Sequence, residues 1–426
     1  RAWRMRLLHL FVLGFVLLGL SFFQPTEAQG TTDCPSFIQT ALQQLGNNCS
    51  NSPTGSACYG NSEITTSYAN PSTSATFSKP GDRVNLGLLN DIHTSAVDIQ
   101  AKKWGLALLS TQANLPKTLN SKGVVMVALG DVQVQNAVLP ADELKLADKP
   151  ITVLVGKQGS DLFNVPTDLK ETSSPFGHVP TGTPLQADGV SPDGKWLRVF
   201  AMHDKTYFQT PNAWVKVSEL SDTVDLKTLP VIGPNSFTLM QSFDLNNGLK
   251  PAACDTDPTS MLYLQGPEQT EVLLHINGTD VRFGSTMLIR ILPPGNIMQF
   301  ISLTGIGVVK TDGQPERVIT PGFASQICLS EPSDKGVRTI GTNCSWTEPN
   351  LLSFNTLEAL YRALDGKIPQ NLQYYRTYVP RLICPSGVGQ VHCRIRIVYE
   401  NLIRHLRDLC QRGLLPKNIC DLYILS

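Results

Sequence analysis

The sequence is poor in charge and lacks the local signatures of common catalytic sites. Only 16% of its residues are charged, and 35 Lys and Arg balance 35 Asp and Glu. A dedicated nucleic-acid binder needs many basic residues for phosphate contacts, so we expect no nucleic-acid partner. The chain also contains neither G-x-S-x-G nor H-E-x-x-H, the signatures of serine hydrolases and zinc proteases. The sequence therefore assigns no catalytic residue and no cofactor, and it leans against an enzyme without excluding one.

Long apolar runs are absent except near the start of the chain. Two arginines precede an apolar run from Leu10 to Leu20, which ends before Thr26-Glu27-Ala28. A basic start, a short apolar run and small residues before a cut are typical of a secretory signal peptide. We predict that residues 1–28 are a signal peptide and that the protein is secreted or lies at the cell surface. The alternative is an uncleaved leader, which would be the only membrane contact.

Ten cysteines are present, and all lie beyond the predicted leader. An even number of cysteines in an exported chain predicts a set of disulfides. A zinc site would need closely spaced pairs such as C-x-x-C, which the sequence lacks, so we predict no metal. The predicted bridges are Cys384–Cys393, Cys410–Cys420 and Cys254–Cys328, with one bridge among Cys34, Cys49 and Cys58 and a longer one to Cys344.

Residues 29–148 are predicted to form a mainly-β unit with a helical lead-in. Apolar residues recur at helical spacing between Cys34 and Leu45, which predicts a short helix. Apolar runs follow at Trp104 to Leu109 and at Val124 to Leu129. Their short length, and the β-branched residues of the second run, favour buried strands.

Residues 150–221 carry the most specific pattern in the chain. Four segments follow one another here: Asn164-Val165-Pro166, Gly182 to Leu185, Asp193 to Val199 and Ala213 to Leu220. They resemble the N-V-R, G-T-x-L, D-G-x-W-x-x-V and G-W-V-x-x-x-x-L motifs of the bacterial SH3-like (SH3b) domain. Two positions depart from that pattern, because Pro166 replaces the Arg and Ala213 replaces the Gly. The resemblance implies a small barrel that recognises cell-wall peptide or glycan, or another protein.

Aromatic side chains of this unit are the predicted ligand-binding residues: Trp196, Tyr207, Phe208 and Trp214. In an SH3-like barrel they would flank a shallow groove and stack on sugar rings or grip a peptide. The alternative for the two tryptophans is the core of a very small barrel, which we favour for Trp214. Alternation along the strand places Trp196 and Arg198 on one face.

The last two regions differ in character. Residues 231–330 contain short apolar strands separated by turn residues, including the hairpin signal Asn277-Gly278. This succession of hairpins looks like the small β-domain of FecR-type surface and signalling proteins. In residues 345–426, a capping box at Asn355 and Glu358 and an apolar stripe between Arg394 and Arg412 predict a pair of helices.

The predicted fold class is multidomain and mainly β, with small barrels or sandwiches including an SH3-like barrel, and with a disulfide-braced α-helical C-terminal region. The predicted function is an exported, non-catalytic bacterial cell-surface or extracellular protein that binds cell-wall peptide or glycan, or another surface protein. Two alternatives remain open at this point. One is a secreted hydrolase whose acid pair comes from distant loops, and the other is a purely structural envelope protein.

Overall fold

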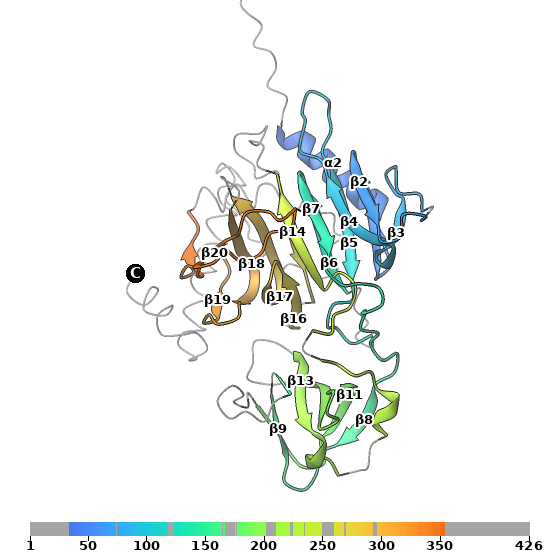
Figure 1. Ribbon diagram of the computed structural model, residues 1–426, viewed down its shortest axis with the longest axis vertical. Helices are drawn as coiled ribbons and strands as arrows, with labels where there is room; N and C mark the ends of the chain where they lie inside the picture. Colours follow the sequence, from blue (N-terminus) through green and yellow to red (C-terminus); the bar gives the residue numbers. More distant parts are fainter. Residues whose placement is uncertain are drawn as a thin grey trace, which may run out of the picture.

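Figure 1 shows a computed structural model of the chain. It describes residues 34–353, with gaps at 74, 118–122, 164, 167–174, 176, 202–209, 222–224, 234, 249–259, 268–269, 293–295 and 335. The predicted leader and the predicted C-terminal helices lie outside the described residues. Within the described part, no helix has the length and apolar character needed to cross a membrane.

A single curled sheet of fifteen strands makes up most of the described chain. Eleven strands follow one another across it: β2 (Ile64–Tyr68), β4 (Leu89–Thr94), β7 (Val132–Asn136), β14 (Ser242–Asn247), β16 (Val272–Ile276), β17 (Thr279–Leu292), β15 (Met261–Gln265), β6 (Val124–Leu129), β5 (Leu106–Thr111), β1 (Ser56–Asn61) and β3 (Arg83–Asn85). Beside this path, β18 (Ile297–Lys310) pairs with β17, β19 (Arg317–Ile319) and β20 (Phe323–Cys328), and β20 pairs with β21 (Asn350–Leu351). The described chain is therefore mainly β, as the sequence predicted.

Two long-range pairings join segments that the sequence analysis treated as separate units. Strand β7 pairs antiparallel with β14, and β6 pairs antiparallel with β15. The segments 29–148 and 231–330 thus contribute to one sheet and to one hydrophobic core. The finer boundaries within the chain remain predictions.

Two long strands, β17 and β18, connect the two parts of the sheet. The first part of β17 pairs with β16 and its last part pairs with β15, while β18 follows it along its whole length with one register shift at Thr286/Met287. The sequence analysis expected only short strands in residues 231–330. The structure has one long strand over Thr279–Leu292, because Gly284, Ser285 and Thr286 continue the extended backbone between the apolar residues on either side.

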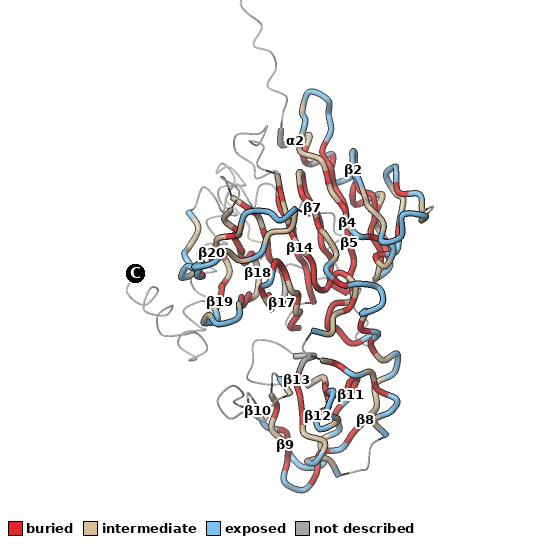
Figure 2. Tube along the Cα trace, viewed as in Figure 1, coloured by how far each residue is buried: buried red, intermediate tan, exposed pale blue. Residues whose placement is uncertain are grey.

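Alternation along the strands builds the core. In β6, Val124, Met126 and Ala128 face the inside of the curl, whereas Val125 and Val127 face outward into a second apolar cluster. Every residue of β6 is buried, which confirms the predicted buried strand. Figure 2 shows buried residues concentrated along the strands of the curled sheet and exposed residues in the connecting loops.

Helix α2 (Cys34–Cys49) covers part of the outer cluster. Its apolar stripe, which includes Ile38, Leu42 and Leu45, is fully buried against that cluster. This confirms the predicted helix and extends it to Cys49.

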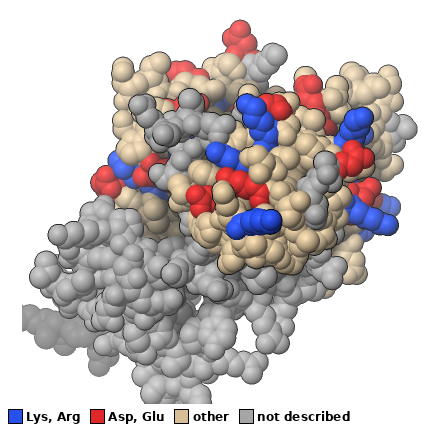
Figure 3. Space-filling model, turned by 90° about the horizontal axis from the view of Figure 1, so that it is seen from below, with Lys and Arg blue, Asp and Glu red and all other residues tan. Residues whose placement is uncertain are grey.

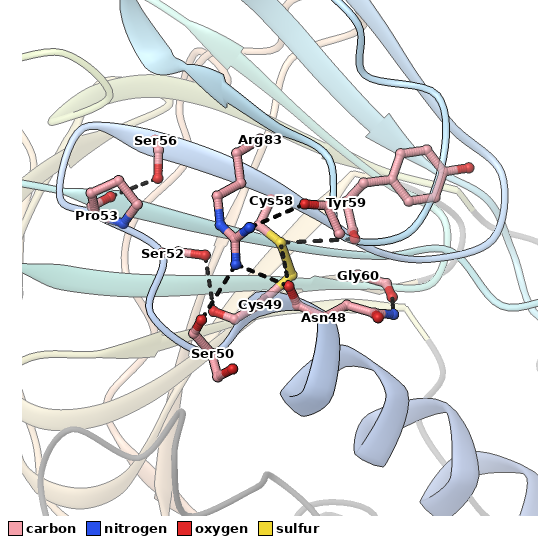
Figure 4. The surroundings of a disulfide bond; sticks show 11 residues. Asn48, Cys49, Ser50, Ser52, Pro53, Ser56, Cys58, Tyr59, Gly60 and Arg83 are labelled. Carbon is pink, nitrogen blue, oxygen red and sulfur yellow. Dashed lines mark hydrogen bonds between the residues drawn. A yellow bond between two sulfur atoms is a disulfide. The ribbon is translucent and has the colours of Figure 1, made fainter.

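A disulfide joins the end of this helix to strand β1, as Figure 4 shows. Cys49 and Cys58 are both fully buried, and their Cα atoms lie 5.8 Å apart. Arg83 donates from Nη2 to the carbonyl oxygens of Asn48 (3.1 Å) and Ser50 (3.3 Å). These carbonyls are among those that a helix end leaves without intrahelical partners, so Arg83 satisfies them. The bridge confirms the prediction of one pair among the first three cysteines.

The second disulfide corrects the predicted connectivity. Cys328, at the end of β20, pairs with Cys344, and their Cα atoms lie 5.4 Å apart. The predicted Cys254–Cys328 bridge and the predicted long bridge to Cys344 are therefore wrong. The segment from 329 to 347 folds back along β20, since Gly341 donates its N–H to Cys328 O and Thr347 donates its N–H to Gln326 O.

A second, smaller β unit lies between β7 and β14 in the sequence and below the curled sheet in Figure 1. Its antiparallel sheet has the order β13 (Thr210–Lys216), β12 (Trp196–Ala201), β11 (Pro184–Val190) and β8 (Ile151–Leu154), with a separate hairpin of β9 (Ser160–Leu162) and β10 (Gly177–Val179). The predicted turn at Asp193-Gly194 is present, with Gly194 at a φ of 72° that suits glycine. Short 3₁₀ turns occur at Leu86–Leu88, Val217–Glu219 and Leu226–Thr228.

Candidate binding module

The small β unit has a hydrophobic core of its own. Residues on one face of β12 and β13, namely Leu197, Val199, Ala213 and Val215, are fully buried in that core. The neighbouring positions of the same strands point to the opposite face, where Trp196 and Arg198 lie beside Lys216 and Trp214 in the register. The predicted alternation of this strand is thus confirmed.

The two predicted tryptophans are covered on this second face. Trp196 is 1% exposed and Trp214 is 5% exposed. They cluster with Leu144, Leu146 and Ile232, which belong to the two segments that connect the unit to the main sheet. The indoles therefore pack against the connecting segments, and neither offers a ring face for stacking on a ligand.

Further contacts fix the Trp196 ring. Phe163 approaches it edge-on, with ring centroids 5.2 Å apart, and Lys216 Nζ lies 5.3 Å from the ring centroid. Edge-on aromatic pairs and cations over an indole are both favourable arrangements. Trp196 is accordingly a structural anchor of the unit. Burial favours the alternative in the sequence analysis, a core role, for both tryptophans.

A buried ion pair lies beside the tryptophans. Arg198 donates from Nε to Asp188 Oδ1 and from Nη2 to Asp188 Oδ2, both at 2.8 Å. Asp188 lies where the β11–β12 register shifts, between Ala187 and Gly189. The bulge is what aims the carboxylate at Arg198, because an extra residue re-aims side chains on the bulged strand.

The other two predicted ligand-binding residues, Tyr207 and Phe208, lie outside the described residues. The structure describes the chain on either side of them, to Ala201 in β12 and from Thr210 in β13. They belong to the connection between two paired strands at the edge of the four-stranded sheet. Their role in ligand binding remains a prediction.

The surface of the small unit carries a histidine–aspartate pair that the sequence analysis did not find. His178 Nδ1 lies 2.7 Å from Asp161 Oδ1, and both side chains are about half exposed. Glycine at position 159 leaves room for the imidazole of His178, since an added Cβ would lie 2.5 Å from His178 Nε2. No local motif marks this pair, because the two residues meet only through the β9–β10 register.

Histidine–aspartate pairs recur on the main sheet. His93 Nε2 lies 2.8 Å from Asp131 Oδ1, and His275 Nδ1 lies 2.9 Å from Asp280 Oδ1. Near the second pair, partial burial raises the pKa of Asp244 above its usual value, and the neighbouring His275 opposes that rise. Among the described residues, no group of three or more His, Cys, Asp or Glu side chains is placed to hold a metal ion.

Comparisons with protein-family models, with curated proteins and with solved structures find no match to this chain. The geometry of the small unit brings the two predicted tryptophans together in a buried cluster.

Proposed function

We propose that this is an exported, non-catalytic binding or scaffold protein, in which the small β unit is an SH3-like recognition module displayed by the curled sheet. The ligand class that its motifs favour is cell-wall peptide or glycan, or another surface protein. The observation that carries the proposal is the way the unit is inserted. Strands β7 and β14 pair side by side in the main sheet, and the connection between them contains a unit with its own core.

The connecting segments hold the module at a defined position. Val190 N donates to Pro230 O, and Ile232 N donates to Val190 O, so the returning segment runs along the end of β11. Leu144 N donates to Phe237 O, which ties the outgoing and returning segments together. A module fixed in this way presents its free surface away from the scaffold, as a binding function requires.

The surface of the module also suits recognition by shape and hydrogen bonding. Figure 3 views the molecule from the side of the module and shows basic and acidic residues interspersed among uncharged ones. Among the described residues in this view, neither sign gathers into a large patch of the kind that a nucleic-acid binder uses. The two disulfides fit folding in an oxidising compartment, which supports export.

The test is co-sedimentation of the mature chain, residues 29–426, with insoluble cell-wall and polysaccharide preparations. One variant replaces residues 140–236 with a short Gly-Ser linker, which removes the module and keeps the β7–β14 pair. A second carries Tyr207→Ala and Phe208→Ala, and its matched control is Leu139→Ala, an exposed apolar residue of the connecting segment. We expect binding by the full chain and the control, and loss of binding by the other two.

Other outcomes would decide against this function. Binding that survives removal of the module would place recognition in the curled sheet. Failure to pellet with any preparation, together with self-association in analytical ultracentrifugation, would favour a structural envelope protein. Release of soluble fragments from the preparations would favour the hydrolase.

A further inference from the structure

Arg290 is a partly buried cation on the outer face of the curled sheet. It lies in β17 directly opposite Gln299 of β18, and Leu288 and Ile301 of the outer apolar cluster occupy neighbouring outward positions on the same strands. Burial among these residues lowers the pKa of the Arg290 guanidinium below its usual value. A cation in such a position needs an anion to offset its lost hydration.

Other arginines of the described chain have partners that Arg290 lacks. Arg198, Arg282 and Arg317 each pair with at least one carboxylate. Arg83 and Arg338 donate to backbone carbonyls. Within the described residues, the partner of Arg290 is a neutral amide, since its Nε donates to Gln299 Oε1 at 2.8 Å.

This hydrogen bond positions a set of donors. Gln299 is only 3% exposed, so its side chain is held in place and in turn fixes the guanidinium. Because Oε1 accepts from Arg290, the amide NH₂ group of Gln299 is a donor on the same face of the sheet. The two terminal nitrogens of Arg290 supply further N–H donors in a planar fork, which matches the oxygens of a carboxylate or phosphate.

A third amide continues the row. Gln326 of β20 lies directly opposite Gln299 in the β18–β20 register, and residues opposite one another share a face of a sheet. Arg290, Gln299 and Gln326 thus form a row across three adjacent strands, with one positive charge at one end.

We propose that the row of Arg290, Gln299 and Gln326 is a binding site for an oxyanion, with the guanidinium as its anchor. The site belongs to the curled sheet and is independent of the small module. The ligand would be a group with two oxygens that accept hydrogen bonds from the planar guanidinium. A carboxylate meets this requirement, and so do phosphate and sulfate.

The experiment measures thermal unfolding of the mature chain in sodium chloride and, at matched ionic strength, in sodium acetate, phosphate or sulfate. An anion that binds only the folded state raises the unfolding midpoint with the logarithm of its concentration. We expect at least one oxyanion to raise the midpoint above that in chloride. A response to acetate alone identifies a carboxylate ligand, and a response to phosphate and sulfate identifies a tetrahedral one.

Three variants make the assignment specific. Arg290→Met should unfold in chloride at the same midpoint as the natural chain or higher, and it should show no oxyanion response. Arg290→Lys keeps the charge without the planar fork, so it should bind the same anion at least several-fold more weakly. Arg317→Met removes a cation that already pairs with Glu348 at 3.0 Å, and it should leave the oxyanion response intact.

Two results would overturn the proposal. If Arg290→Met unfolds in chloride well below Arg317→Met, the guanidinium is already satisfied within the chain. If every oxyanion raises the midpoints of the natural chain and Arg290→Met equally, the effect is a general salt effect and no site exists at Arg290.

Discussion

Removing Arg198 or Asp188 alone should destabilise the small unit far more than removing both. The two hydrogen bonds that join these side chains are both 2.8 Å long, and the side chains are 3% and 6% exposed. Arg198→Met leaves a carboxylate buried without a counter-ion, which costs about 3–5 kcal/mol. The double variant Arg198→Met/Asp188→Leu removes both charges, and apolar replacement of a whole buried pair is often neutral, so we expect a loss under about 1 kcal/mol.

Urea unfolding followed by tryptophan fluorescence measures this difference, because Trp196 and Trp214 lie on the same face of the unit. With a urea dependence of about 2 kcal/mol/M, a loss of about 4 kcal/mol lowers the midpoint by about 2 M. Lys117→Met is the control, since Lys117 and its partner Asp148 are 41% and 87% exposed. An exposed pair contributes at most about 1 kcal/mol, so the control should unfold close to the natural chain.

The coupling between the two charges is refuted if the losses measured for Arg198→Met and for Asp188→Leu add up in the double variant. Additive losses would mean that the two charges act independently and that each stabilises the unit through other contacts. A loss below about 1 kcal/mol for either single variant would show that water reaches the pair and that its burial is not maintained in solution.

Three further predictions concern the main sheet. Gly248→Ala should cost about 1–3 kcal/mol of stability in thermal unfolding, because the added Cβ would lie 1.6 Å from Asp131 Oδ2. Burial holds the pKa of Asp244 above its unfolded value, so folding favours the protonated acid, and this contribution is lost as pH rises through the folded pKa. Asp244→Asn should therefore raise the unfolding midpoint at pH 7, and the gain should vanish below about pH 4. Replacing Cys328 and Cys344 with Ser should cost about 3 kcal/mol in denaturant unfolding, since the bridge closes a loop with a sequence separation of 16.

Each of these has a result that would contradict it. Gly233→Ala is the matched control for Gly248→Ala, as its added Cβ meets no atom closer than 3.4 Å. Equal midpoints for the two alanine variants would refute the predicted clash. A pH-independent effect of Asp244→Asn would show that its carboxyl group does not titrate differently on folding. Peptide mapping that finds Cys328 bridged to a residue other than Cys344 would refute the second disulfide.

Local signals in the sequence predicted local structure well. Asn277-Gly278 was expected as a tight hairpin turn, and the structure places both residues at positive φ, 49° and 82°, between β16 and β17. Strand alternation correctly separated Leu197 from Trp196, because side-chain direction along a strand depends only on the backbone repeat. The helix beginning at Cys34 was predicted from the spacing of its apolar residues, which follows the helical repeat.

Contacts between distant residues were not predictable in this way. The pairing of Asn136 with Phe243, the meeting of Arg198 with Asp188 and the bridge from Cys328 to Cys344 depend on how strands are ordered in space. Each apolar strand has many possible partners of similar hydrophobicity, and only the packing of the whole core selects among them. The burial of Trp196 depends likewise on Leu144 and Ile232, which lie far from it in the sequence.

The insertion of the small unit between two paired strands also constrains the order of folding. Joining β7 to β14 while the intervening chain is unfolded would require closing a long flexible loop, and that entropy cost falls once the unit is compact. The unit forms its own sheet from residues close in sequence, so we expect it to fold first and to act as a rigid turn for the strands that flank it. Slower refolding of the main sheet in the Arg198→Met variant would verify this dependence, whereas an unchanged rate would show that the two parts fold independently. A defect within the module would then affect the scaffold through the rate at which its two halves meet.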